Sequence, residues 1–210
     1  MKINLLSAIS FLFALLLLCS GYLSLQSVFI TNAIESRLDY FSNYSAPAVR
    51  ENDTKFREPN PSSLTTSAHQ LNSFVLFSQW VSYLQNTNLE STHEIVLLSA
   101  SSHIRPTWSN TYVELAKLSK DAQQAYQYQQ LAILFGPYSP SSRLLYIDNT
   151  FTHWQNREVS HQIKASQSLI EITKIWRHRS SLNQMIAHSK GKQRLCNMLK
   201  FNELKVQACG

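Results

Sequence analysis

The stretch IRPTWSNTYVELAKLSKDAQQAYQYQQLAILFGPYSP, residues 104–140, contains two prolines, Pro106 and Pro140, that stand 34 residues apart. Each proline stands at the head of a helical pattern, because proline suits the first turn of a helix and disfavours helical geometry in the residue before it. Asp121 is a candidate N-cap residue for a second helix between them. Gly136-Pro137 then predicts the end of that helix, because glycine favours C-terminal caps and proline cannot continue the helix.

A helix, a short turn and a second helix within about 34 residues are typical of a tetratricopeptide (TPR)-like repeat. Ala125 and Ala132 stand seven residues apart, as the two small packing residues of such a repeat do. Thr107 and Ser139 are N-cap candidates for the first helix and for the helix after the hairpin. A plain helical bundle gives similar periodicities, so both architectures remain open. The predicted fold class is mostly α, with an N-terminal transmembrane helix followed by a degenerate TPR-like helical-hairpin domain.

The rest of the chain predicts three regions. Residues 1–34 form a transmembrane anchor or a signal peptide, residues 35–63 a polar linker rich in proline and charge, and residues 64–210 a helical TPR-like domain with a basic tail. Four glycines in 210 residues are too few for many glycine-dependent β-hairpins, which agrees with a helical domain.

Lys2 is the one charged residue before Glu35, and the uncharged stretch between them is long enough to cross a bilayer as a helix. Two interpretations remain open, an uncleaved anchor and a signal peptide cleaved near Cys19-Ser20-Gly21. Both predict export of the remaining chain. We expect a single-pass protein of the cytoplasmic membrane, with its amino terminus inside and its body in the periplasm.

The cysteines agree with export. Cys196 and Cys209 are 13 residues apart at the carboxy terminus, and in an oxidising compartment they are a disulfide candidate. Free thiols in a cytosolic tail are the alternative. The apolar residues that we expect the disulfide to hold against the body are Met198, Leu199, Phe201, Leu204 and Val206.

The positive charge is a property of the carboxy terminus. Residues 1–173 contain 11 Lys and Arg against 12 Asp and Glu, whereas residues 174–210 contain eight Lys and Arg against Glu203 alone, a net charge of +7. Lys190, Lys192 and Arg194 are therefore candidate contacts for an anionic partner, such as lipid head groups, an acidic polysaccharide or another protein. A solvated tail is the alternative. Export argues against nucleic acid as the partner.

Arg105, Trp108 and Tyr112 form a second candidate interaction site. An aromatic pair one helical turn apart, with an arginine nearby, could stack on a sugar. Packing into the neighbouring helix is the preferred interpretation, because large rings stabilise most when buried.

The sequence predicts no catalytic residues, no metal site and no cofactor. Seven histidines are scattered without carboxylates or cysteines at ligand spacing, and no glycine-rich phosphate loop or nucleophile elbow is present.

The residues Arg105-Pro106-Thr107-Trp108, together with Tyr112-Val113-Glu114-Leu115-Ala116-Lys117-Leu118, resemble the VpsP proteins of bacterial exopolysaccharide biosynthesis clusters. The likeness covers residues 64–140 and the general layout of an apolar anchor and a helical body. It implies an accessory role in polysaccharide production or export, beside other membrane proteins of an assembly machine, with no active site to carry over.

Two functions follow from these observations. The first is a membrane-anchored, non-enzymatic scaffold or accessory protein in bacterial polysaccharide biosynthesis or export. The second is an exported carbohydrate-acting enzyme of unrecognised type. The scaffold is preferred, because glycoside hydrolysis usually needs a facing pair of carboxylates and the 13 acids here are widely spread.

Overall fold

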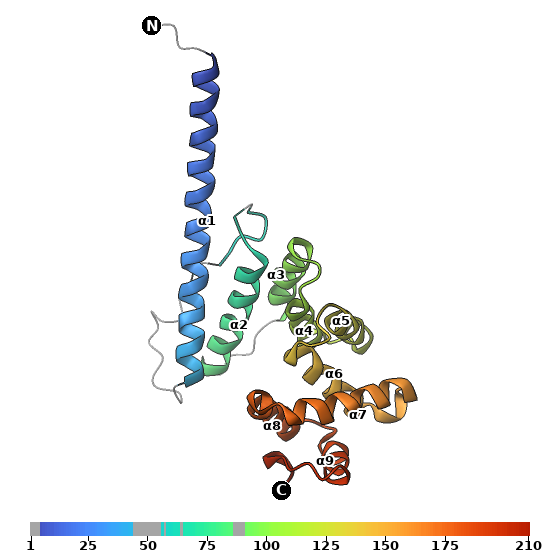
Figure 1. The fold of residues 1–210 in the computed structure, drawn as a ribbon. Coiled ribbons are helices and arrows are strands. Elements are labelled where there is room, and N and C mark those ends of the chain that lie inside the picture. The colour runs from blue at the N-terminus through green and yellow to red at the C-terminus, as the bar shows by residue number, and fades with distance from the viewer. Residues whose placement is uncertain (1–4, 44–55, 57, 64, 86–90) are drawn as a thin grey trace. The chain divides into compact units, whose positions relative to one another are not determined.

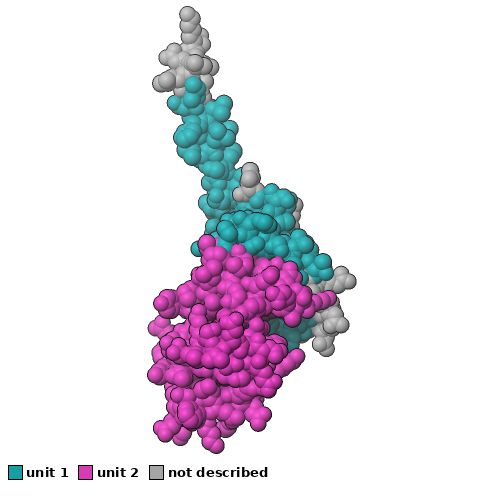
Figure 2. Space-filling view, turned by 90° about the vertical axis from the view of Figure 1, so that its right-hand side faces the viewer, with its two compact units in different colours: residues 1–106 teal, residues 107–210 magenta. Residues whose placement is uncertain are grey.

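The computed structural model describes residues 5–43, 56, 58–63, 65–85 and 91–210. Within these ranges the chain is mostly helical and contains no β-strand, which confirms the predicted mostly-α class (Figure 1). The chain divides into two compact units, residues 1–106 and 107–210, coloured teal and magenta in Figure 2. This division differs from the predicted boundaries after residues 34 and 63; residues 44–55 and 57 of the predicted linker lie outside the described residues.

The described part of the first unit contains three helices, α1 (Leu5–Asn43), α2 (Ala68–Gln85) and α3 (Ser91–Ile104). Helix α1 continues past Ile34 into the predicted linker, so the linker does not begin at residue 35. The reason is tertiary packing, because Ile34 is fully buried and lies in one apolar cluster with Phe77 of α2. Burying side chains of this size stabilises a contact by about 1.5–3 kcal/mol each.

Polar contacts along the same face also hold α1 against α2. Ser27 Oγ donates a hydrogen bond of 3.0 Å to Gln70 Oε1, and Glu35 Oε1 lies 2.6 Å from His69 Nε2. Figure 1 shows α2 beside the carboxy-terminal half of α1. The last turns of α1 are therefore part of the first unit.

The amino-terminal half of α1 has a different environment. Its large apolar side chains are exposed in this unit, among them Leu12, Leu16 and Leu18. One stretch of α1, Ile9–Asp39, is long and apolar enough to cross a membrane.

The second unit contains six α-helices in three successive pairs: α4 (Ser109–Leu118) with α5 (Ala122–Phe135), α6 (Pro140–Thr152) with α7 (Val159–Lys174), and α8 (Arg179–His188) with α9 (Lys192–Phe201). Three short 3-10 helices accompany them: η2 (Trp154–Asn156), η3 (Trp176–His178) and η4 (Gln207–Cys209). Helix α6 is central, because it contacts α4, α5, α7, α8 and α9.

One apolar core joins α6 to α7, α8 and α9. The fully buried members include Ile147 and Phe151 of α6, Leu169 of α7, Leu182 of α8 and Leu195 of α9. These residues recur at helical spacing on the inner faces of their helices, as expected for amphipathic helices that share a core.

The helix termini agree with part of the sequence prediction. Asp121 is the N-cap of α5, and its carboxylate accepts a 2.8 Å hydrogen bond from the Gln124 amide; Gly136 is the C-cap. Ser139 is the N-cap of α6 with Pro140 in the first turn, but its side chain makes no capping hydrogen bond. The Thr107 prediction is wrong, because α4 begins at Ser109 with Trp108 as its N-cap.

These two caps make a matched pair for mutagenesis. Asp121→Ala is expected to lower the free energy of unfolding by about 1 kcal/mol, because it removes the acceptor for an otherwise unsatisfied amide. Ser139→Ala removes no capping hydrogen bond and is expected to change it by less than about 0.5 kcal/mol. Denaturant unfolding followed by circular dichroism measures both; equal losses would contradict the assigned caps.

Candidate functional site

The carboxy terminus is closed by a disulfide. Cys196 of α9 and Cys209 of η4 are bonded, with their Cα atoms 5.4 Å apart, which confirms the predicted pairing. Within the enclosed segment, Leu199 is fully buried, and Leu204 and Val206 pack against the core of the second unit. The segment is therefore a structural part of that unit.

The prediction for Phe201 is wrong, because its side chain is 86% exposed. Leu195 and Leu199 define the buried face of α9, and Phe201 follows Leu199 by two residues. Two residues turn a helix by about 200°, which places Phe201 on the opposite face.

A Schellman motif ends α9. Glu203 adopts the left-handed conformation with φ of 57°, the Leu204 amide donates to Leu199 O at 2.9 Å, and the Glu203 amide donates to Lys200 O at 3.0 Å. Glycine usually occupies this position. A further bond, from the Ala208 amide to Asn183 Oδ1 at 2.9 Å, fastens the end of the chain to α8.

The predicted basic residues lie on the surface of the second unit. Lys190, Lys192 and Arg194 are all exposed, and Arg194 Nη1 donates to Phe151 O at 3.3 Å. The five other basic residues of the segment are also exposed: Lys174, Arg177, Arg179, Lys200 and Lys205. Within the described residues, none of these eight forms an ion pair, so their charge is available to a partner.

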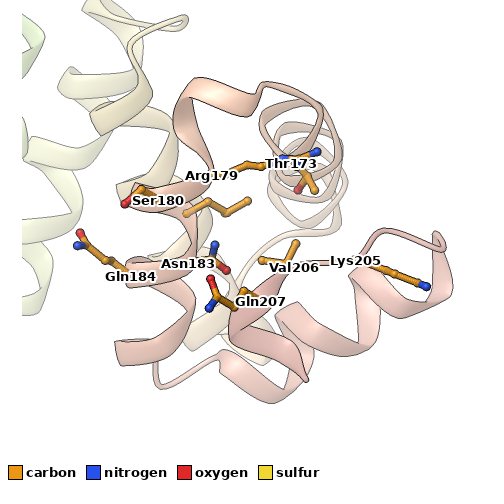
Figure 3. A pocket seen from close by; sticks show the side chains of 9 residues that line it. Thr173, Arg179, Ser180, Asn183, Gln184, Lys205, Val206 and Gln207 are labelled. Carbon is orange, nitrogen blue, oxygen red and sulfur yellow. The ribbon is translucent and has the colours of Figure 1, made fainter.

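A polar cleft of about 490 Å³ lies beside the disulfide-closed segment (Figure 3). Its walls come from the end of α7, from α8 and from the chain that leads into η4. The polar lining residues include Thr173, Arg179, Ser180, Asn183, Lys205 and Gln207. In Figure 3 the Lys205 side chain points outward from the rim.

The lining of this cleft has two cations and no carboxylate among the described residues. Guanidinium, ammonium, hydroxyl and amide groups all donate hydrogen bonds to an anion, and charged donors make the stronger bonds. The sequence indicated Arg179 and Lys205 as possible anion contacts, because both belong to the basic segment 174–210. The sequence did not indicate Thr173 or Gln207, because only the packing of α7, α8 and η4 brings them together.

The second predicted interaction site divides between the two units. Arg105 lies in the first unit and is exposed, whereas Trp108 and Tyr112 lie in the second. Tyr112 is buried, and its ring centroid lies 6.4 Å from that of Tyr128 and 5.6 Å from that of Phe135. Burial raises the pKa of Tyr112, and Tyr128 raises it further. The Tyr112 ring is therefore packed inside the α4–α5 hairpin, and Trp108 is half-buried at its start.

In the part of the chain that the structure describes, no three His, Cys, Asp or Glu side chains come together in a metal-binding arrangement. No protein-family model, curated protein or solved structure matches this chain. The function proposed below therefore depends on the residues and their arrangement, together with the resemblance at residues 105–118.

Proposed function

We propose that this chain is a membrane-anchored, non-enzymatic scaffold or accessory protein in bacterial polysaccharide biosynthesis or export. Helix α1 crosses the cytoplasmic membrane once with its amino terminus inside, and the rest of the first unit and the whole second unit lie in the periplasm. The VpsP resemblance at residues 105–118 supports the link to polysaccharide. The proposed partners are other membrane proteins of the assembly machine, and an anionic polysaccharide or lipid head groups at the basic surface; nucleic acid is not among them.

The observation that carries the proposal is the change of environment along α1. Its apolar side chains are exposed from Ile9 to Phe29, a length of about 30 Å at 1.5 Å per residue, which matches a bilayer core. From Ser27 onward the same helix bonds to and packs against α2. A bilayer around the first half would cover the apolar surface that the unit itself leaves exposed.

The disulfide supports the external location of the second unit. Bonds of this kind persist in oxidising compartments such as the bacterial periplasm and are rare in the cytosol.

The helix pairs of the second unit support the scaffold role. We infer that they form a short, degenerate TPR-like solenoid, in which α4–α5 and α6–α7 are successive hairpins. Such arrays bind partners through extended surfaces and need no catalytic residues.

Two reporter fusions after Gly210 test the topology. An enzyme that folds only after export is expected to be active there, and a fluorescent protein that folds only in the cytosol is expected to be dark. Deleting residues 5–28 should reverse both results, because it removes the exposed apolar half of α1. Activity of the cytosolic reporter on the full chain would contradict the proposal.

A gene deletion tests the polysaccharide link separately. Surface polysaccharide, measured as its component sugars after washing and hydrolysis, should fall and should recover on complementation with the full chain. Unchanged polymer in the deletion strain would contradict the proposed function, whatever the topology.

A further inference from the structure

A groove of about 490 Å³ lies on a different side of α9 from its buried face. It is lined by Phe151, Trp154, Arg194, Asn197, Met198 and Phe201. The four residues from α9 follow the spacing i, i+3, i+4 and i+7, so they form one stripe along the helix. Leu195 and Leu199 point into the core instead, and α9 therefore presents two separate faces.

The groove contains aromatic rings from three places in the chain. The Phe151 and Trp154 rings lie 4.9 Å apart where α6 passes into η2, and Phe201 stands at the end of α9. Phe201 is 86% exposed, so its ring is accessible to a partner.

We propose that this groove docks a short amphipathic segment of a partner protein. The segment places an apolar side chain against Trp154 and Phe201 and a carboxylate against the guanidinium of Arg194. The inference rests on the proposed scaffold function and names the chemistry of its partner.

The lining favours a protein over a sugar chain. Aromatic residues, Met and Arg are the types enriched at the centres of protein interfaces. The polar side-chain groups of the lining are those of Arg194 and Asn197 and the indole N–H of Trp154, whereas a sugar brings many hydroxyl groups that lose water on binding and need hydrogen-bond partners.

Charge favours an acidic partner. Arg194 uses one nitrogen on Phe151 O, and a guanidinium has further donors for a carboxylate. Lys190, Lys192 and Lys200 are exposed on or beside α9. A second copy of this chain is the wrong occupant by charge, because residues 107–210 hold 13 Lys and Arg against six Asp and Glu.

The test uses the full chain in its native membrane, with a photoreactive benzophenone amino acid in place of Phe201. After irradiation, mass spectrometry should identify a crosslinked peptide from one protein, with an Asp or Glu within a few residues of the crosslink. The matched control carries the same probe at Tyr138, which is 89% exposed in the same unit and outside the groove, and should not give that crosslink.

Arg194→Glu should lower the crosslink yield about tenfold or more, because the new glutamate would repel the partner's carboxylate. Lys120→Glu, at an exposed position outside both the groove and the basic segment 174–210, should leave the yield unchanged. Changing the partner's acid to Lys should restore crosslinking to the Arg194→Glu chain. An intact Cys196–Cys209 disulfide in each variant shows that the segment has kept its fold.

Several results would overturn the proposal: a sugar, a lipid or a second copy of this chain at the crosslink, equal yields at Phe201 and Tyr138, no crosslink, or no effect of Arg194→Glu. If any of these occurs while the exported reporter is active and the deletion strain loses polymer, the groove assignment fails and the scaffold function stands.

Discussion

Gly191→Ala is expected to lower the free energy of unfolding of the second unit by about 3 kcal/mol, the upper part of the usual range for overpacking. A Cβ atom at this position would lie 2.7 Å from the carbonyl carbon of Phe151 and 2.9 Å from its oxygen. It would also lie 2.8 Å from the amide nitrogen of Thr152. All three are backbone atoms of α6, so no side-chain rotation can relieve the contact, and α9 must move away from the core.

The φ angle of Gly191 is −86°, which any residue adopts, so the effect arises from the close approach alone. Thermal and denaturant unfolding of the full chain in detergent measure it. Gly210→Ala is the matched control, because a Cβ there meets nothing within 4 Å and the midpoint should not change. An unchanged midpoint for Gly191→Ala would mean that α9 does not rest on α6 at this point.

Replacing both Cys196 and Cys209 with serine is expected to cost about 3 kcal/mol, because a disulfide that closes a loop of roughly 15 residues restricts the unfolded chain by about that amount. The loss should appear as a lower unfolding midpoint. Cys19→Ser is the control: Cys19 is a free, exposed cysteine on α1, and its replacement should leave the midpoint unchanged.

The bond itself can be counted. Protein from the native membrane, alkylated at lysis and weighed without reduction, should carry one alkyl group, on Cys19, and three after reduction. Three groups before reduction would mean that the carboxy terminus does not meet an oxidising compartment, and the proposed topology would be wrong.

The same bond supports the cleft at α8. Lys205, Val206 and Gln207 line that cleft and lie inside the loop that Cys196 and Cys209 close. The double serine variant is therefore expected to loosen the wall of the cleft that Lys205, Val206 and Gln207 form, while Arg179 on α8 stays in place.

Local sequence patterns determined much of this protein. An uncharged apolar stretch forms a helix because helix formation satisfies every backbone group within the segment. The carboxylate of Asp121 caps its neighbouring amide, and Gly136 ends the same helix. Two cysteines near one end of an otherwise cysteine-poor chain formed a pair. Each of these features depends on residues close together in the sequence.

Tertiary structure alone decided the other features. Helix α1 passes residue 34 because Ile34 meets Phe77, a residue 43 positions away. Glu203 adopts a conformation that glycine usually occupies, because burial of Leu199 and Leu204 on the core offsets its strain. Phe201 faces solvent because Leu195 and Leu199 set the rotation of α9. The cleft at α8 and the groove at α9 likewise depend on contacts between distant helices. The physical reason is that the free energy of burial depends on which surfaces meet. Local periodicity shows that one face of a helix is apolar, but it does not show which other surface covers that face.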